Sequence, residues 1–459
     1  MLDTMLIFGA TGDLTSRYLL PALAKLYKKK KLSDAFQIVG VARQKWDGDK
    51  FRNHIAESLA KHGGPTEDGH GLLKNLEYRQ CDAAVPKEIA AFLKPFRKPV
   101  VVYLAIPSAL FEPVADALAR AELASGSRIV FEKPFGHDLA SARKLNRLIG
   151  ESFPENEVFR VDHFLHKQTI QNVLGLRFAN RIFEPVWNAH HVERVEIVWD
   201  ETLSAEGRAS YYDSMGALRD MLQNHLLQLL CLVAMEAPHS LAERNFRDRK
   251  VDVLRAIRRL SEEEVKKRTV RGRYVAGAIE GSAIPAYVDE KGVDPRRNTE
   301  TFAQVMLFVD NWRWSGVPFI LRTGKALSRE RKNIEIHFKP VPHLVFGQDG
   351  EPVPNVLRLN TTPDQLAVQV NINGTGDPFE LERLEVNAEF SPHELPAYAR
   401  LLIDVLEGDP ILSIRDDEAE ESWRIMEPIV EAWQRDSVPL IEYPAGSAGP
   451  RPAQSSLLP

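Results

Sequence analysis

Residues 219–230 bring a candidate proton acceptor into an otherwise apolar stretch. Asn224 and His225 stand among leucines of a predicted helix. A histidine has an unperturbed pKa of about 6.5, so it can accept a proton at neutral pH when a carboxylate orients it. An alcohol that is oxidised by hydride transfer needs such a base on its hydroxyl group. A histidine that is only a hydrogen-bonded core residue is the alternative here.

A second polar segment, Arg160-Val161-Asp162-His163-Phe164-Leu165-His166-Lys167, suits anion binding. If the segment is helical, His163 and Lys167 are four residues apart and share one face. Two converging cationic groups form a seat for an anion such as a substrate phosphate. The alternative is the charged, solvated face of an ordinary helix.

A glycine turn near the N-terminus suits a dinucleotide. Gly9 and Gly12 stand between an apolar run at 5–8 and a stretch with helical periodicity at 14–27. Such a turn lets the backbone and the helix N–H groups approach a pyrophosphate. The spacing is Gly-x-x-Gly and not Gly-x-Gly-x-x-Gly, so a plain turn remains the alternative.

The residue that follows the second apolar run, at 36–42, indicates which dinucleotide is bound. This residue is Arg43, whereas NAD enzymes usually place an acid there to bind the ribose 2′-hydroxyl. An arginine suits a 2′-phosphate. The sequence therefore predicts NADP, with use of NAD left open and an ordinary surface arginine as the alternative.

Glu132-Lys133-Pro134-Phe135-Gly136 closes a further strand pattern at 128–132. Ligands bind at the carboxyl ends of strands in open α/β sheets. We therefore expect Lys133 to lie near the nicotinamide and the substrate. The Lys133–Pro134 bond could be cis or trans.

The elements that must position these residues change in character along the chain. Apolar runs at 5–8, 36–42, 99–106 and 128–132 alternate with helical stretches, which predicts a Rossmann-like parallel sheet. After about residue 160, helices are expected at 162–180, 210–236 and 394–407. Strands are expected at 192–199, 302–309, 319–322, 334–339 and 366–372, without the helices that parallel strands need.

We therefore expect two domains. Residues 1–160 form an α/β dinucleotide-binding domain, and residues 161–459 form a larger α+β domain with a mostly antiparallel sheet for substrate binding and oligomerisation. The basic stretch 255–273 is expected to be a solvated helical face.

Composition excludes several classes of protein. The chain has 459 residues and a formal net charge of −5, so no nucleic-acid partner is indicated. Its two cysteines, Cys81 and Cys231, provide neither a disulfide scaffold nor a thiolate metal site and suit the cytoplasm. No signal peptide is visible, and no apolar run approaches the roughly 20 residues that span a bilayer, so no membrane association is expected.

Together these segments resemble the glucose-6-phosphate dehydrogenase family nearly from end to end. The Gly-Ala-Thr-Gly-Asp-Leu turn at 9–14 resembles the family's nucleotide turn. Arg160 to Lys167 resembles its Arg-Ile-Asp-His-Tyr-Leu-Gly-Lys signature. Further matches are Glu132 to Gly136, Asp220 with Gln223-Asn224-His225, and the stretches 311–314, 316–319, 322–325, 415–423 and 446–450.

The resemblance implies a dehydrogenase that oxidises glucose 6-phosphate at C1 to 6-phosphoglucono-δ-lactone with NADP. It implies that His225 is the general base and that Asp162 holds and polarises it. His163 and Lys167 would bind the 6-phosphate, and the remaining substrate contacts would come from Lys133, Glu201, Asp220 and Lys325. Cofactor contacts would come from Gly9, Thr11, Gly12, Asp13, Leu14, Arg43 and Lys133. The family uses no metal and forms homodimers or homotetramers through the large second-domain sheet.

The chain departs from the family pattern in its substrate seat. The signature tyrosine is Phe164, and the residues that flank Lys167 are His166 and Gln168 in place of glycine and glutamate. A cationic phosphate ligand expected after Lys325 falls on Glu330, so Arg329 or Arg331 would have to substitute for it. An expected glutamine falls on Asn360. These departures affect the identity of the substrate more than the type of reaction.

Four other kinds of protein share some of these features. A Gfo/Idh/MocA-like sugar dehydrogenase shares the Rossmann domain and Glu-Lys-Pro, but lacks the signature and the Asn-Trp-Arg-Trp stretch. A homologue that acts on another phosphosugar would account for the altered seat. A non-catalytic NADP-binding regulator or a dimerisation protein is disfavoured because Lys133, Asp162 and His225 are all present.

Overall fold

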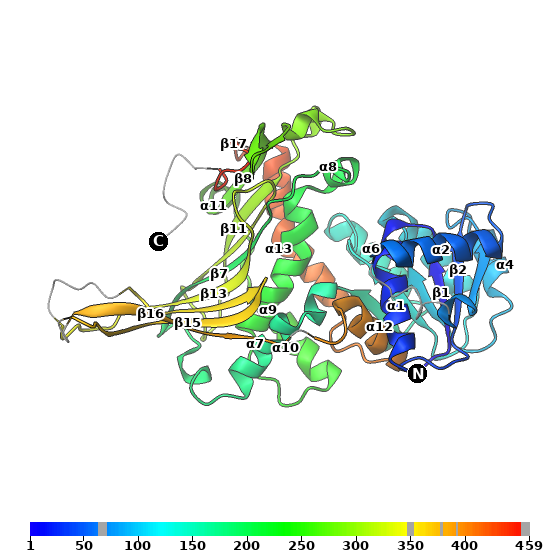
Figure 1. Cartoon of the computed structure of the whole chain (residues 1–459), viewed down its shortest axis with the longest axis horizontal. Coiled ribbons are helices and arrows are strands. Elements are labelled where there is room, and N and C mark those ends of the chain that lie inside the picture. Colours follow the sequence, from blue (N-terminus) through cyan, green and yellow to red (C-terminus); the bar gives the residue numbers. More distant parts are fainter. Residues whose placement is uncertain (63–70, 347–352, 377–379, 392, 451–459) are drawn as a thin grey trace. The chain divides into compact units, whose positions relative to one another are not determined.

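The chain forms two compact units (Figure 1). The computed structural model describes residues 1–62, 71–346, 353–376, 380–391 and 393–450. The first unit comprises residues 1–167, 238–247 and 393–420, and the second comprises the described residues of 168–237, 248–392 and 421–459. No helix among the described residues has the length and apolarity that crossing a bilayer requires.

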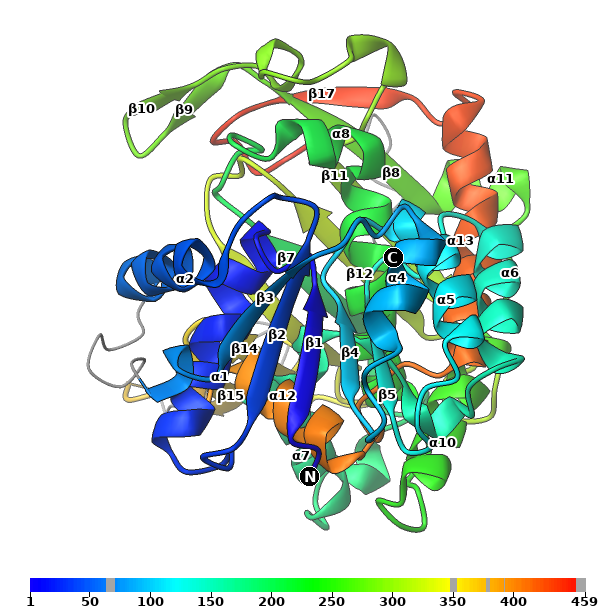
Figure 2. The same cartoon turned by 90° about the vertical axis from the view of Figure 1, so that its right-hand side faces the viewer.

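The first unit contains a six-stranded sheet in the order β3-β2-β1-β4-β5-β6, and each neighbouring pair is parallel (Figure 2). This is the strand order of the dinucleotide-binding Rossmann fold, which confirms the predicted α/β sheet. The strands are β1 Thr4–Phe8, β2 Gln37–Ala42, β3 Leu76–Gln80, β4 Val101–Leu104, β5 Arg128–Glu132 and β6 Val158–Val161.

Helices cover both faces of this sheet because successive strand residues point to opposite sides. Met5 and Ile7 of β1 pack with α1, α2 and α12, whereas Leu6 and Phe8 pack with α4, α5 and α6. The elements are η1 Thr15–Leu19, α1 Leu20–Lys28, α2 Gly48–His62, α4 Pro86–Leu93, η2 Ser108–Leu110, α5 Phe111–Arg120, α6 Leu139–Gly150, η3 Glu155–Glu157, η4 His163–His166 and α12 Ala397–Glu407.

The second unit contains a nine-stranded sheet in the order β16-β15-β14-β13-β7-β12-β11-β8-β17. Only the β7–β12 and β8–β17 pairs in this sheet are parallel, which confirms the predicted mostly antiparallel sheet. The strands are β7 Val192–Asp200, β8 Thr269–Val275, β11 Phe302–Phe308, β12 Pro318–Gly324, β13 Arg331–Phe338, β14 Val356–Thr361, β15 Asp364–Asn373, β16 Leu381–Glu389 and β17 Leu440–Pro444, with a separate hairpin of β9 Gly277–Ile279 and β10 Ser282–Ile284.

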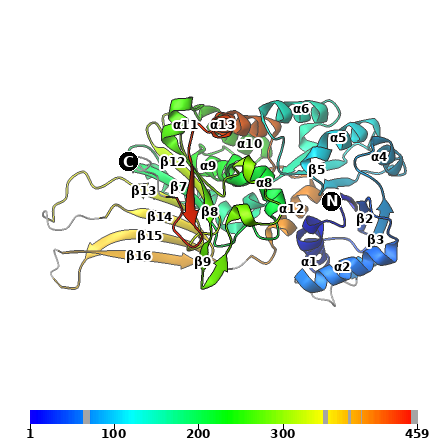
Figure 3. The same cartoon turned by 90° about the horizontal axis from the view of Figure 1, so that it is seen from above.

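Helices pack on this second sheet, and α9 runs alongside the strands in Figures 1 and 3. The π-helix η6 contacts β11 and β12, while α7 contacts β14 and β15. The elements are α7 Gln168–Phe178, η5 Glu184–Val186, α8 Ala209–Ala217, η6 Leu218–Leu226, α9 Leu227–Ala234, α11 Glu262–Arg268, η7 Tyr287–Asp289 and η8 Pro295–Arg297; α10 Glu243–Ala256 and α13 Asp416–Gln434 each have residues in both units.

Two predicted helices are wrong in their continuity. The segment 210–236 is not one continuous helix, because Gly216, with a φ of 71°, kinks the chain near the end of α8, just before η6 begins. The segment 162–180 begins with the short 3₁₀ turn η4, and α7 starts only at Gln168. Apolar spacing does not distinguish these local variants from a continuous α-helix.

The prediction of a solvated helical face over 255–273 is wrong at its C-terminal end. Residues from Thr269 form strand β8, and Arg271 within it is only 3% exposed. The Arg271 guanidinium donates to the carbonyls of Trp433 and Val438 and to Asp436. These three acceptors, distant in sequence, allow a charged residue to be buried.

Candidate active site

A cavity of about 420 Å³ lies at the carboxyl ends of the parallel strands in the first unit. Four of the predicted cofactor residues line it, namely Gly9, Thr11, Gly12 and Arg43. The lining also includes residues that sequence reasoning missed, among them Cys81 to Ala84 after β3 and Ala105 to Pro107 after β4. The β3 strand itself was missed because its residues are mostly exposed and lack an apolar run.

Gly9 makes the tight turn that this cavity requires. Its φ is 83°, and a Cβ added there would lie 2.1 Å from the Ala105 carbonyl oxygen. The Gly12 N–H donates to the Gly9 carbonyl at 2.9 Å, and the Thr15 hydroxyl donates to the same oxygen at 3.1 Å. No side chain fits at Gly9, so a ligand can approach the bare backbone.

Arg43 stands exposed at the border of this cavity. The backbone on either side is held by Tyr78, whose hydroxyl contacts the carbonyls of Ala42 at 3.2 Å and Gln44 at 2.6 Å. The carboxylate in the described lining is Asp82, which follows β3 and accepts from the Ala84 N–H. A glycine turn, an open strand end and an arginine after β2 fit a dinucleotide with a 2′-phosphate.

The other predicted cofactor residues lie outside the described lining of this cavity. Asp13 is exposed and pairs with Arg17 at 2.6 Å, and Leu14 packs against the hydrophobic core. Lys133 follows β5, and the Lys133–Pro134 bond is cis.

Asp162 and His163 follow β6, the strand beside β5. Asp162 is 2% exposed, and its Oδ1 accepts from the Phe164 N–H at 2.9 Å. The His163 ring stacks on Tyr398 of α12, with centroids 5.2 Å apart and planes at 16°. The first unit therefore fixes both side chains by contacts that sequence spacing does not reveal.

The expectation that His163 and Lys167 share a helix face is wrong. His163 opens the 3₁₀ turn, and Lys167 follows it with an extended backbone. The Lys167 Nζ lies 4.7 Å from the centroid of the Phe164 ring. Any convergence of the two cations must therefore come from side-chain placement and not from helical spacing.

Glu132 and Tyr398 are neighbours of the predicted site residues, and the sequence assigned no role to either of them. The Tyr103 hydroxyl donates to Glu132 Oε1 at 2.6 Å, and Tyr398 also hydrogen-bonds to this carboxyl. Burial raises the pKa of Glu132 to about 7, against the opposing effects of the Tyr103 hydrogen bond and the charge of Lys133. Tyr398 is more than 200 residues from β5 and β6, so no local pattern could place it beside them.

His166, which replaces the family's glycine, connects η4 to α12. Its ring is 4% exposed, with Nδ1 3.4 Å from the Asp162 carbonyl oxygen and Nε2 3.0 Å from Asp404 Oδ2. A glycine could make neither contact. This departure therefore adds a contact between the segment that carries Asp162 and His163 and helix α12.

In the second unit, Glu201 and Lys325 form an ion pair of 2.7 Å. Strand register brings them together: β7 and β12 are parallel neighbours, and Gly324 lies opposite Asp200. The Lys325 Nζ also lies 5.2 Å from the ring centroid of the buried Tyr212. Burial, aided by the charges of Asp220 and Glu201 among others, raises the pKa of the Tyr212 hydroxyl.

Asp220 and His225 both lie on the π-helix η6, and His225 is 1% exposed. In an α-helix, residues five apart point about 140° from each other. A π-helix hydrogen-bonds residue i to i+5, which places them on the same side. The wider winding therefore gives Asp220 and His225 a common face, and π-turns of this kind are frequent at functional sites.

Several departures from the family pattern have defined positions. Glu330 is exposed and pairs with Lys332. Arg331 Nε is 3.6 Å from Asp200, Arg329 is exposed, and the Asn360 amide donates to Gln365 at 3.1 Å. Arg331 is therefore already engaged by a carboxylate, whereas Glu330 offers a phosphate no positive charge.

Another charged cluster lies on β7 and β13. Ligand-type atoms of Glu196, Glu335 and His337 are within 4.8 Å of one another. Arg194 contacts Glu196 at 2.9 Å, and Arg358 contacts Glu335 at 2.8 Å. Because each carboxylate has an arginine partner, we interpret this cluster as an ion-pair network on the sheet.

Comparison with known proteins identifies the family. The model of the glucose-6-phosphate dehydrogenase NAD binding domain matches residues 6–172, and that of the glucose-6-phosphate dehydrogenase C-terminal domain matches residues 174–458.

The chain is 41% identical to glucose-6-phosphate 1-dehydrogenase of Mycolicibacterium smegmatis, over 97% of this chain and 93% of that protein. It is 39% identical to the enzyme of Treponema pallidum, over 98% and 92%. A solved glucose-6-phosphate dehydrogenase in complex with its substrate superposes with a TM-score of 0.88 at 30% identity, over 98% of this chain and 95% of that one. The chain belongs to the glucose-6-phosphate dehydrogenase family.

Proposed function

We propose that this protein oxidises D-glucose 6-phosphate at C1 to 6-phosphoglucono-δ-lactone with NADP. The observation that carries this proposal is the likeness, over nearly the whole chain, to a glucose-6-phosphate dehydrogenase solved with its substrate. Family membership also disfavours the Gfo/Idh/MocA-like alternative. The preformed Glu201–Lys325 pair and the buried His225 support the same reaction.

The cofactor is held by the first unit in this proposal. Gly9, Thr11, Gly12 and Arg43 surround the dinucleotide, with Asp13, Leu14 and Lys133 contributing at the turn and at the end of β5. NADP supplies, when bound, the nicotinamide that takes up the hydride from C1. The guanidinium of Arg43 selects the 2′-phosphate, and NAD remains a weaker substitute.

His225 removes the proton from the C1 hydroxyl. An imidazole accepts this proton at neutral pH when its orientation is fixed. We assign that orientation to Asp162, a buried carboxylate that accepts a hydrogen bond from the Phe164 N–H at the start of η4. The negative charge of Asp162 stabilises the imidazolium that forms.

The sugar phosphate is bound by cationic and polar groups. The 6-phosphate is bound by His163 and Lys167 through charge-assisted hydrogen bonds. The sugar hydroxyls or the phosphate region are bound by Lys133, Glu201, Asp220 and Lys325. The Glu201–Lys325 pair presents one acceptor group and one donor group side by side before substrate arrives.

We also propose the assembly and location of the protein. The dinucleotide-binding part is assigned to residues 1–160, and the substrate-binding and oligomerising part to residues 161–459. A homodimer or homotetramer would form through the large sheet, because the edge strand β16 is exposed along almost its whole length. The buried side chains of Cys81 and Cys231 agree with a cytoplasmic location.

A steady-state assay of the purified protein tests the activity. Glucose 6-phosphate, glucose and other hexose phosphates are each compared with NADP and with NAD. We expect kcat/KM to be highest for glucose 6-phosphate with NADP and free glucose to be a poor substrate. A higher kcat/KM for another hexose phosphate would favour the alternative phosphosugar dehydrogenase, and no turnover of any sugar would favour the non-catalytic regulator.

A further inference from the structure

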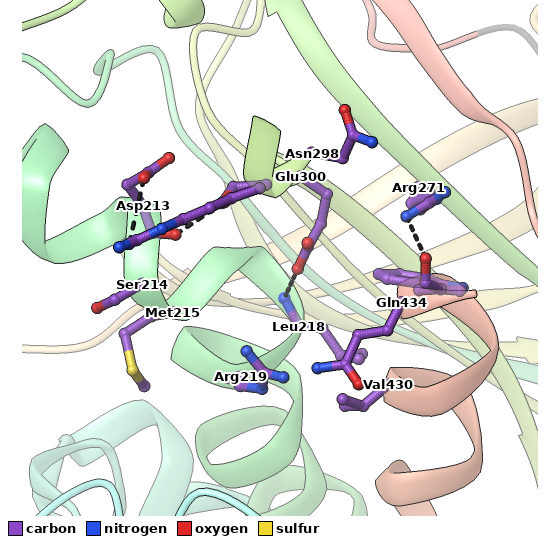
Figure 4. Close-up of a pocket in the computed structure, with 13 residues that line it drawn as sticks. Asp213, Ser214, Met215, Leu218, Arg219, Arg271, Asn298, Glu300, Val430 and Gln434 are labelled. Atoms are coloured by element: carbon purple, nitrogen blue, oxygen red, sulfur yellow. Dashed lines mark hydrogen bonds and ion pairs between the residues drawn. The ribbon is translucent and has the colours of Figure 1, made fainter. Parts of the chain in front are cut away.

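The described residues that line a second cavity of about 420 Å³, in the second unit, include none of those assigned to the active site above (Figure 4). It is bordered by the α8–η6 junction, strand β8, the segment after η8 and the C-terminal end of α13. The lining residues are Asp213, Ser214, Met215, Leu218, Arg219, Arg271, Arg297, Asn298, Thr299, Glu300, Val430, Trp433 and Gln434.

The acidic groups of this cavity are already compensated. Asp213 accepts from Tyr287, from the Asp294 N–H and from Arg297 at 3.3 Å. Glu300 accepts from the Leu218 N–H at 2.9 Å, and burial raises the pKa of its carboxyl. The cavity therefore presents little uncompensated negative charge to a ligand.

The charge of Arg219 acts on Glu300 and lowers the pKa of its carboxyl against the effect of burial, but the N–H groups of the positive residues do not all have an acceptor. The Arg271 guanidinium donates hydrogen bonds to the carbonyls of Trp433 and Val438 and to the carboxylate of Asp436. The Nε of Arg219, by contrast, is buried and has no hydrogen-bond partner among the residues that the structure describes. A buried guanidinium N–H without an acceptor is costly, which makes an oxyanion a favourable occupant.

The residues around Arg219 indicate which other chemical groups a ligand of this cavity would carry. Figure 4 shows the Arg219 and Gln434 side chains directed into the space between η6 and α13. Gln434 and Asn298 offer amide groups at the border. Met215, Leu218, Val430 and Trp433 supply apolar surface, so the cavity combines one cation, two amides and an apolar wall.

We propose that this cavity binds a small organic anion, in which a phosphate or carboxylate that contacts Arg219 is joined to an apolar body. A guanidinium binds either oxyanion through parallel N–H donors. The apolar wall distinguishes such a ligand from inorganic phosphate, which would leave it unfilled.

The site is placed to influence the reaction. Arg219 directly precedes Asp220 and shares the π-helix η6 with His225. Glu300 caps the start of the same helix through Leu218. A ligand on Arg219 therefore acts on the element that carries the proposed base, a coupling that rests on the proposed function.

Calorimetric titration with phenyl phosphate tests the site, with benzoate as the carboxylate form and inorganic phosphate as the form without an apolar body. We expect Arg219→Gln to weaken phenyl phosphate binding by about 10-fold or more, because a charge-assisted contact is lost. Lys167→Gln removes one positive charge from the proposed substrate seat and should leave this binding unchanged.

Loss of binding in Lys167→Gln with full binding in Arg219→Gln would place the probe in the substrate seat and overturn the proposal. Inorganic phosphate that binds as tightly as phenyl phosphate would overturn the apolar part of it. The relative affinities of phenyl phosphate and benzoate decide which oxyanion the site prefers.

The coupling is tested by the kinetics of glucose 6-phosphate oxidation with and without saturating phenyl phosphate. We expect kcat or KM to change in the wild type and in the charge control Lys267→Gln, but not in Arg219→Gln. Identical kinetics with and without the probe in a wild type that binds it would overturn the coupling and leave the activity itself intact.

Discussion

At the scale of single residues, the side chains assigned to chemistry depend on neighbours from distant parts of the sequence. Lys325 is held by Glu201, His163 by Tyr398, and the backbone beside Arg43 by Tyr78. A charged or aromatic group that is already held loses less conformational freedom when substrate binds. Substitutions at this scale should therefore separate chemistry from binding.

The first residue prediction concerns the base. We expect His225→Asn to lower kcat by about 100-fold or more with a near-normal KM, since the proton acceptor is lost while the fold is kept. His190→Asn, an exposed histidine of the same unit, is the control and should retain full activity. Nearly wild-type kcat in His225→Asn would exclude His225 as the base.

A second prediction at the residue scale concerns the choice between NADP and NAD. Arg43→Ala should reduce kcat/KM for NADP by about 10-fold or more and change the value for NAD much less, because only NADP carries the 2′-phosphate. Lys45→Ala removes a nearby exposed charge and should have a smaller effect. Equal losses with both cofactors would contradict the assignment of Arg43.

The third concerns the buried carboxyl of Glu132, whose pKa is about 7 in the folded chain against an ordinary value of 4.5. Between these pH values the folded state keeps a proton that the unfolded state loses, so the free energy of unfolding falls as pH rises from about 4.5 to 7. The fall amounts to about 3 kcal/mol.

The glutamine side chain in Glu132→Gln cannot titrate, so this variant should lack the fall in the free energy of unfolding that Glu132 causes. Urea unfolding at pH 5 and pH 8 measures it: the wild type should lose about 3 kcal/mol more than the variant between the two pH values. Parallel losses in both proteins would show that Glu132 does not hold a proton in the folded state.

At the scale of elements, the π-helix η6 is the feature that organises the second unit's site. Glu300 caps its first turn, and Gly216 forms the kink near the end of α8 that precedes it. Because residues five apart lie on one side of a π-helix, the winding decides which residues accompany His225. The conformation at Gly216 is therefore a condition for the site.

Gly216→Ala tests this condition. The added Cβ would lie 2.4 Å from Glu300 Oε1, in addition to the cost of about 1–3 kcal/mol for a side chain at φ 71° and ψ 168°, a region open essentially to glycine. We expect a lower Tm and a loss of kcat that exceed those of Gly207→Ala, which has a φ of 77° but no atom within 4 Å of the added Cβ. Equal losses of Tm and kcat in both variants would show that the packing of Glu300 on Gly216 does not cause the effect.

At the scale of the whole molecule, each unit contributes a sheet, and the two sheets differ in how they are covered. Helices shield both faces of the six-stranded sheet, whereas β16 at the edge of the nine-stranded sheet is exposed along almost its whole length. Ile372, Leu384 and Val386 are large apolar side chains exposed on β15 and β16. An open edge with apolar side chains favours association with a second copy.

Val386→Lys should weaken the proposed oligomer, because a charge would be buried in the interface. We expect sedimentation analysis to show a dissociation constant raised by about 10-fold or more. Ile182→Lys is the control, since Ile182 is 72% exposed but lies outside the sheet. An unchanged oligomer in Val386→Lys, or its loss in both variants, would count against this surface.

Much of the fold could be predicted from the sequence because its signals are local. Apolar runs and their spacing are fixed by which side of a strand or helix faces the core, and they gave the parallel sheet and the mostly antiparallel one. The glycine turn and Arg43 were found in the same way, since strand, turn and helix are contiguous. Strands β3 and β16, whose side chains are mostly exposed, carry no such signal.

The sequence by itself determined the two sheet types and the family, and it supplied the candidate residues for the dinucleotide turn and for hydride transfer. Only the tertiary structure decided the π-winding of η6, the pairing of Glu201 with Lys325, the placement of Tyr398 beside Glu132 and His163, and the burial of Arg271. These features depend on strand register and on contacts between residues far apart in the chain. Local periodicity contains no information about such contacts.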